Sequence, residues 1–200
     1  MAAQTEQKRI IIVIVLLIVL ILGIFVVRGR NKANLEQKKN PEITDNVTSI
    51  IEEQKDQNII FLTSDKTNLE VGEELSVNIS FTAPGKKLFG SDVILLYDPD
   101  LLTTSEANIT QGNFFGSYPR KTVDPINGIV KVNAFMANPE NAVMKAYDIF
   151  SVKFKALKKG TARISLSFEK GKTNLTTLVE AETSMNILEN TTGISISIDE

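Results

Sequence analysis

The stretch ELSVNISFT, Glu74 to Thr82, alternates apolar and polar side chains without a break. One side of an extended chain then holds four apolar residues, Leu75, Val77, Ile79 and Phe81. A period of two is typical of a half-buried β-strand, because successive side chains point to opposite faces of a sheet. The stretch therefore predicts a sheet with one face in a core and the other in solvent.

The same period returns on both sides of this stretch and extends to the end of the chain. It is clearest in GIVKVNAFM (128–136), YDIFSVKFKA (147–156), TARISLSF (161–168) and GISISID (193–199). Clusters of Gly, Pro, Asn and Asp separate these runs, and no amphipathic helix of useful length interrupts them. Short strands with frequent turns predict an all-β domain over residues 59–200, in the form of an antiparallel β-sandwich.

The composition excludes several classes of function. The 200 residues include no Cys, His or Trp, and the formal net charge is −2. Zinc sites of the usual kind, thiol chemistry and His-dependent catalytic triads are therefore absent. No basic block is large enough to follow a phosphate backbone, so we expect no nucleic-acid partner. We predict no catalytic residues, no metal and no cofactor.

The N-terminal part predicts a membrane anchor. After a short tail (residues 1–9), residues 10–27 are uniformly apolar and would span about 27 Å as a helix, close to the thickness of a bilayer core. The alternative is a cleaved signal peptide, but the run is long for one and no small-x-small cleavage site follows. Residues 28–58 are polar and are expected to form a linker with a reach of about 30 Å.

Two observations bear on the orientation of this anchor in the membrane, and they point in opposite directions. More Lys and Arg residues follow the apolar run than precede it, which alone would place the C-terminal domain in the cytoplasm. Large domains are translocated regardless of such charges, however, and the outward strand positions are rich in Thr, Ser and Asn, as in surface modules. We therefore predict a single-pass membrane protein with its C-terminal domain outside the cytoplasm.

The order of the segments resembles the cohesin family. LEVGEELSVNISF (69–81), GSDVILLYDPDLL (90–102) and FSVKFKALKKGTARISL (150–166) follow one another as they do in cohesins, and the resemblance covers residues 68–198. It implies a jelly-roll-type sandwich of about nine strands that is not an enzyme. Cohesins receive dockerin modules on one sheet face and organise polysaccharide-degrading assemblies, and the wider superfamily includes carbohydrate-binding modules.

The resemblance also implies a position for the binding face. Asp92 matches a cohesin residue that points to the partner, although Gly90 stands where many dockerin-binding cohesins have a polar side chain. Strand alternation places Ile94 and Leu96 outward beside Asp92, and Val93, Leu95 and Tyr97 in the core. We extend this candidate partner-binding face with three residues of the 128–136 run, Lys131, Asn133 and Phe135.

Three further groups of residues are candidate sites with simpler alternatives. The Asp98-Pro99-Asp100 corner has too few oxygen ligands for calcium and is expected to be a plain turn. Phe114, Phe115 and Tyr118 in the loop GNFFGSYP are a candidate glycan contact, or else a plug for the open end of the sandwich. The pairs Glu73/Glu74 and Glu180/Glu182 would serve a glycosidase only across a cleft, with one raised pKa.

These observations predict a membrane-anchored surface module that binds a dockerin-like protein and is linked to polysaccharide handling. Two alternatives remain open at this point. One is a carbohydrate-binding module in the same fold, whose partner would be a polysaccharide. The other is a spacer domain of an envelope protein without a specific ligand.

Overall fold

The computed structural model of this chain describes residues 57–136 and 139–200. The predicted tail (1–9), the predicted membrane helix (10–27) and nearly all of the predicted linker (28–58) lie outside the described residues. Within the described ranges, no helix is both long and apolar enough to cross a membrane.

The first of two sheets is built around β3 (Glu74–Thr82), the strand with the uninterrupted alternation. Its antiparallel neighbours are β1 (Ile59–Ser64) and β9 (Tyr147–Ala156). Short strands complete this sheet, with β12 (Asn190–Thr192) beside β1, and β5 (Leu102–Thr103) and β6 (Ile109–Gln111) beside β9. A single 3-10 turn, η1 (Glu106–Asn108), connects β5 to β6.

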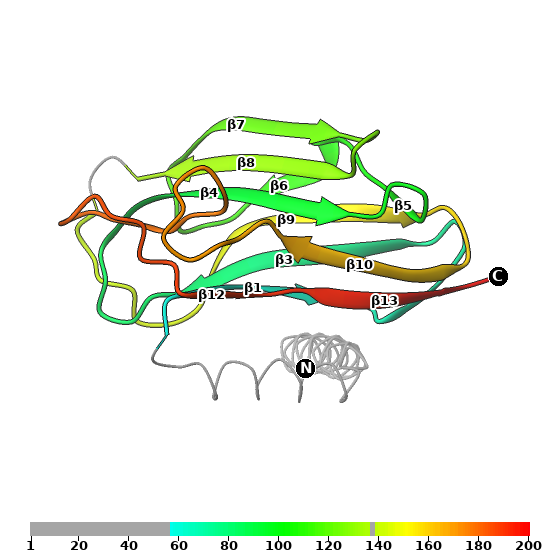
Figure 1. Ribbon diagram of the computed structural model, residues 1–200, viewed down its shortest axis with the longest axis horizontal. Coiled ribbons are helices and arrows are strands. Elements are labelled where there is room, and N and C mark those ends of the chain that lie inside the picture. The colour runs from blue at the N-terminus through cyan, green and yellow to red at the C-terminus, as the bar shows by residue number, and fades with distance from the viewer. Residues whose placement is uncertain (1–56, 137–138) are drawn as a thin grey trace, which may run out of the picture. The chain divides into compact units, whose positions relative to one another are not determined.

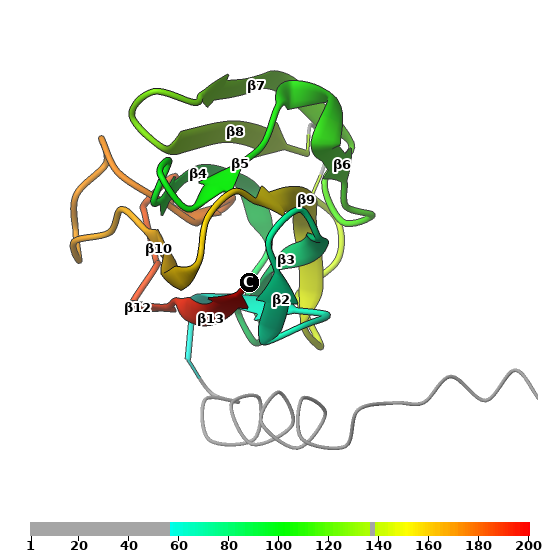
Figure 2. The ribbon, with the colours of Figure 1, turned by 90° about the vertical axis from the view of Figure 1, so that its right-hand side faces the viewer.

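The second sheet has β4 (Leu88–Tyr97) near its centre, between β8 (Ile129–Phe135) and β10 (Gly160–Leu166). β7 (Ser117–Asp124) is the edge strand beyond β8. The opposite edge, beyond β10, consists of β13 (Ile194–Asp199) and β2 (Asn68–Glu70), while β11 (Val179–Glu180) pairs with the start of β4. Figure 1 shows that the long strands of both sheets run in similar directions across the domain, and Figure 2 shows β7 and β8 on the side of the domain away from β13.

Side chains from both sheets form one core between the layers. All four apolar residues of β3 are at most 1% exposed, and so are Phe150, Val152, Phe154 and Ala156 of β9. The predicted inward residues of β4, Val93, Leu95 and Tyr97, are buried as well. The alternation therefore assigned the core faces of the long strands correctly, since each buried face packs on the other sheet.

Two polar residues of β3 that were predicted to face outward are buried. The pairing of β3 with β9 shifts register between Ile79 and Ser80, and the Ser80 hydroxyl donates to Asp148 at 2.5 Å. The Thr82 hydroxyl donates to the carbonyl oxygen of Gln57 at 2.9 Å. A hydrogen-bond partner is what makes the burial of a hydroxyl tolerable, and a register shift cannot be seen in the sequence of one strand alone.

The predicted all-β sandwich is confirmed, but its predicted strand number of about nine and its antiparallel pairing hold only in part. The described residues contain thirteen strands, and two pairs are parallel, β1 with β12 and β13 with β2. Five of the strands have only two or three residues. A strand that short shows no measurable alternation, so the sequence pattern misses it.

Candidate partner-binding face

The structure brings all six residues of the candidate partner-binding face together on β4 and β8. Antiparallel pairing sets Asp92 directly opposite Asn133, Ile94 opposite Lys131, and Gly90 opposite Phe135. Leu96 pairs with Ile129 at the next position. We call the outward side chains of β4, β8 and the neighbouring β7 the β4–β8 face.

The other edge of β4 is completed by two different segments. β10 pairs with β4 only at Leu95, Leu96 and Tyr97. Closer to the start of β4, threonine hydroxyls take over: the Ile94 amide donates to Thr176 at 3.1 Å, and the Asp92 amide to Thr177 at 3.2 Å. The amide of Thr177 donates in return to the carbonyl oxygen of Asp92 at 2.8 Å. The backbone that presents Asp92 and Ile94 is therefore fixed on both sides.

The outward residues of this face differ in exposure. Asp92 and Lys131 are exposed, whereas Ile94, Leu96, Asn133 and Phe135 are half-buried. Residues 173–175 line the same hollow as Ile94, so a neighbouring loop provides part of its cover. Ile94 is thus shielded on one side by this loop, and both apolar residues remain partly open to a partner.

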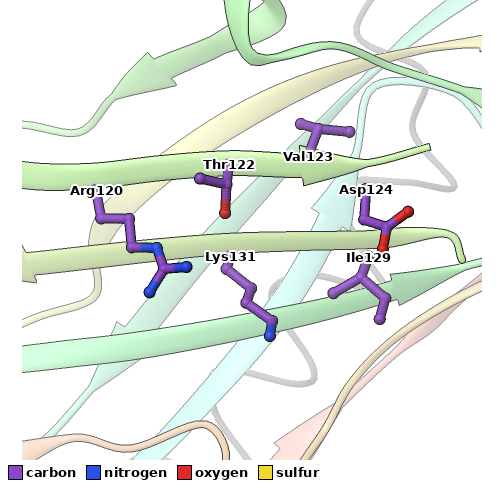
Figure 3. A pocket seen from close by; sticks show the side chains of 6 residues that line it. All are labelled: Arg120, Thr122, Val123, Asp124, Ile129 and Lys131. Carbon is purple, nitrogen blue, oxygen red and sulfur yellow. The ribbon is translucent and has the colours of Figure 1, made fainter. Parts of the chain in front are cut away.

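Three shallow hollows follow β8 from one end to the other. The first, about 400 Å³, lies between Phe89, Phe135 and Val179 and extends to Asp92 and Asn133. The second continues from Asp92 and Asn133 to Lys131 and Arg120. The third runs from Arg120 and Lys131 to Ile129 and Asp124, and Figure 3 shows the Arg120 and Lys131 side chains extending across the strands there. Each hollow shares two lining residues with the next, so the three follow one another in a row along β8.

The two carboxylates of the β4–β8 face accept hydrogen bonds from uncharged N–H groups. The side-chain amide of Asn133 donates to the Asp92 carboxylate. Asp124 accepts from the Asn127 side chain at 2.7 Å and from the backbone N–H groups of Ile126 and Asn127 in the β7–β8 turn. These bonds, above all those from Asn127, hold the pKa of Asp124 below its usual value.

The basic groups of this face have no ion-pair partner among residues 57–136 and 139–200. Arg120 and Lys131 are both exposed. In the part of the chain that the structure describes, the ion pairs are Lys66–Glu73, Lys86–Glu180 and Lys172–Glu169, none of which involves them. The face therefore presents two cations whose charge is not neutralised by direct contact.

Sequence reasoning missed Arg120, Phe89 and Val179. β7 reads SYPRKTVD and is half-exposed along its length, so it shows no alternation that would assign Arg120 to a face. Phe89 is 48% exposed and stacks on Phe135 with ring centroids 6.4 Å apart, because the side-chain order of β4 is irregular at its start. The one sequence signal for this end of the face was Gly90, because many dockerin-binding cohesins have a polar side chain at that position.

The aromatic loop lies against the core. Phe115 is 4% exposed, and Phe114 packs edge-on against Phe81 at 4.9 Å and against Phe115 at 5.0 Å. The Tyr118 hydroxyl donates to the carbonyl oxygen of Ile149 at 2.5 Å, and burial raises the pKa of Tyr118 to about 12. A sugar-binding platform needs an exposed ring face, whereas these rings pack against one another and against the core.

The Asp98-Pro99-Asp100 corner is a turn closed by its own groups. The Asp98 carboxylate accepts the amide of Asp100 at 2.9 Å, and the Asp98 carbonyl oxygen accepts the amide of Leu102 at 3.0 Å. Across residues 57–136 and 139–200 no three acidic side chains gather as a metal site would require. The hydrogen bonds account for the corner without a ligand.

The carboxylate pairs do not have the electrostatics of a glycosidase. Glu180 is buried and accepts hydrogen bonds from Lys86 at 2.8 Å and from the Thr183 hydroxyl at 2.6 Å. These bonds lower the pKa of Glu180, and the one from Lys86 has the largest effect. A backbone hydrogen bond from Glu70, followed by Lys66, lowers the pKa of Glu73. A general acid needs a raised pKa, so both carboxylates are suited to structural roles.

Comparison with known proteins identifies the fold. The chain resembles a type II cohesin domain from the cellulosome of Acetivibrio cellulolyticus, at 22% identity with a TM-score of 0.50 over 70% of this chain and 95% of that one. A type II cohesin–X-dockerin complex from the same organism matches at 19% identity with a TM-score of 0.55 over 72% and 100%. A non-cellulosomal cohesin from the archaeon Archaeoglobus fulgidus matches at 14% with a TM-score of 0.53 over 72% and 92%.

The family itself is shown by the sequence. No curated protein matches the chain. The cohesin domain model, however, matches residues 60–198, which is the whole sandwich from β1 to β13. The resemblance seen in the order of the segments is confirmed, and this chain belongs to the cohesin domain family.

Proposed function

We propose that this cohesin domain is a non-catalytic recognition module that receives a dockerin-type protein on the β4–β8 face. The observation behind this proposal is the arrangement on adjacent strands of Asp92, Asn133 and two half-open apolar residues, Ile94 and Leu96, above a rigid sheet. Polar groups beside apolar side chains on a rigid, hydrogen-bonded scaffold are typical of protein interfaces. A solved relative of the same fold is a cohesin–X-dockerin complex, which supports the choice of partner.

The test is a binding titration with the complete 200-residue chain in a mild non-ionic detergent. The probes are a panel of purified dockerin modules, and the variant is Asp92→Ala with Leu96→Lys. We expect binding to fall at least about 100-fold, because the variant removes one polar contact and puts a charge at an apolar position of the interface. Thermal unfolding of the variant verifies that the sandwich still folds.

The matched control is Glu74→Ala with Ser76→Lys. It makes the same change of charge on one strand, β3, of the other sheet. Binding should survive it. If both variants bind equally well, the site lies elsewhere. If no dockerin binds but a polysaccharide does, the domain is a glycan-binding module, and if neither binds, a spacer role is favoured.

We further propose that the apolar segment 10–27 anchors the domain at a cell surface, where it would take part in the handling of polysaccharides. The length of the segment and the polar linker after it support this, as does the origin of a structural relative in a cellulosome. Protease treatment of intact cells is the test. Loss of the domain while the anchor survives supports a surface location, and full protection contradicts it.

A further inference from the structure

The β4–β8 face changes character along its length, beginning with an apolar end. Phe89 and Phe135 stack there with their rings 30° apart, and Val179 lines the opposite side of the hollow. Gly90 lies between them: a Cβ atom at this position would come within 2.9 Å of the Ala134 carbonyl oxygen and 3.4 Å of the Phe135 Cβ. The close approach of β4 and β8 therefore favours a glycine here, and one of the two aromatic rings beside it, that of Phe89, is 48% exposed. An apolar side chain of a partner fits this hollow best.

The middle of the face carries two cations beside two carboxylates. Arg120 and Lys131 line both the second and the third hollow, and Figure 3 shows them on adjacent strands, β7 and β8. The nearby carboxylates of Asp92 and Asp124 are hydrogen-bonded to the neutral amides of Asn133 and Asn127. Both carboxylates keep their negative charge, but among the described residues neither lies within ion-pair distance of Arg120 or Lys131. Each cation can therefore still receive a carboxylate of a partner in direct contact.

The spacing between the two ends is set by the strands. Phe135 is two residues from Asn133, the partner of Arg120, and four residues from Lys131. At about 3.4 Å per residue, the basic groups lie roughly 7–14 Å from the apolar hollow. One short segment of a partner protein spans this distance.

We infer that the partner segment places an apolar side chain in the hollow formed by Phe89, Phe135 and Val179, and one or more carboxylates against Arg120 and Lys131. The segment lies along β8, with its apolar and acidic groups about 7–14 Å apart. This inference rests on the proposed function and specifies the chemistry of the partner.

The test selects binders from a displayed library of helical hairpins with randomised exposed positions, using the complete chain in a mild non-ionic detergent as bait. We expect the selected sequences to be enriched in Asp and Glu near an apolar anchor, and their binding to weaken as salt is raised. Arg120→Glu with Lys131→Glu should lower the affinity of these binders at least about 10-fold and, in a new selection, enrich Lys and Arg instead. Phe89→Ala should weaken the same binders.

The matched control is Lys153→Glu with Lys155→Glu, which makes an identical change of charge on the exposed side of β9 in the other sheet. It should leave the affinity unchanged. Binders whose affinity falls with Leu96→Lys but is unchanged by Arg120→Glu with Lys131→Glu and by Phe89→Ala would overturn this inference while keeping the proposed function. Binders that ignore Leu96→Lys as well, or a selection that yields no binder, would overturn both.

Discussion

Asn133 on β8 donates its side-chain hydrogen bond to the carboxylate of Asp92, the residue directly opposite it on β4. Both residues line the apolar hollow of Phe89 and Phe135 as well as the neighbouring hollow of Arg120 and Lys131. It joins the two strands of the β4–β8 face through side chains as well as through the backbone. The carboxylate is held in a defined position before a partner arrives, which lowers the entropy cost of using it for recognition.

Replacing this amide by a carboxylate, in Asn133→Asp, is expected to destabilise the domain at neutral pH. Two like charges would then stand directly opposite each other on adjacent strands, a situation that costs about 0.2–1 kcal/mol. Urea unfolding at pH 7 and at pH 3 measures the effect, which should shrink in acid as carboxylates take up protons. Asn133→Ala is the control, since it removes the hydrogen bond without adding charge. An equal loss for both variants at both pH values would contradict the explanation.

Gly128 in the β7–β8 turn is predicted to be the least replaceable glycine of the face. Its φ is +64°, and a Cβ atom would lie 2.1 Å from the carbonyl oxygen of Tyr97. Gly128→Ala should therefore cost more than about 2 kcal/mol of unfolding free energy, from backbone strain and from displacement of β4. Gly171→Ala is the matched control, with φ +82° but nothing within 4 Å of the added atom. Urea unfolding should give the control only the conformational cost, about 1 kcal/mol. Equal losses would show that the contact with Tyr97 is unimportant.

The long half-buried strands of this domain could be predicted because each alternates over seven residues or more, as β3 and β9 do. The position of Asp92, Ile94 and Leu96 followed from the same rule and from the family resemblance. The opposition of Asp92 and Asn133 could not be predicted, because 41 residues separate them and the register is fixed by pairing between distant strands. Arg120 could not be assigned to the face because an exposed edge strand has no buried side that would produce an alternating pattern. Phe89 could not be assigned because the alternation of β4 is irregular where the strand begins.

Tyr97 gives a prediction that no sequence pattern contains. Its hydroxyl is buried, without a hydrogen-bond partner among the described residues, while its ring packs edge-on against Phe154 at 5.1 Å. Tyr97→Phe keeps the ring and removes the unsatisfied group, so we expect the stability to stay equal or to rise by up to about 1 kcal/mol. Chemical unfolding at pH 7 provides the comparison. A loss of more than about 1 kcal/mol would mean that the hydroxyl is bonded, for instance to a buried water.

The buried Tyr97 and the half-buried Tyr118 predict that the domain loses stability in alkali. Burial raises the pKa of Tyr118 to about 12 and, together with a smaller effect of Asp124, raises the pKa of Tyr97. The folded state therefore keeps these protons at a pH where the unfolded chain, with tyrosines near pKa 10, releases them. The stabilising effect is complete below about pH 10 and disappears as the pH rises toward 12, so the unfolding free energy should decline over that interval. The measurement is urea unfolding between pH 8 and pH 12.

Tyr97→Phe with Tyr118→Phe should reduce the decline, although Tyr118→Phe also removes the hydrogen bond to Ile149 and so lowers stability at every pH. An unchanged slope in this double variant would assign the alkaline loss to other groups.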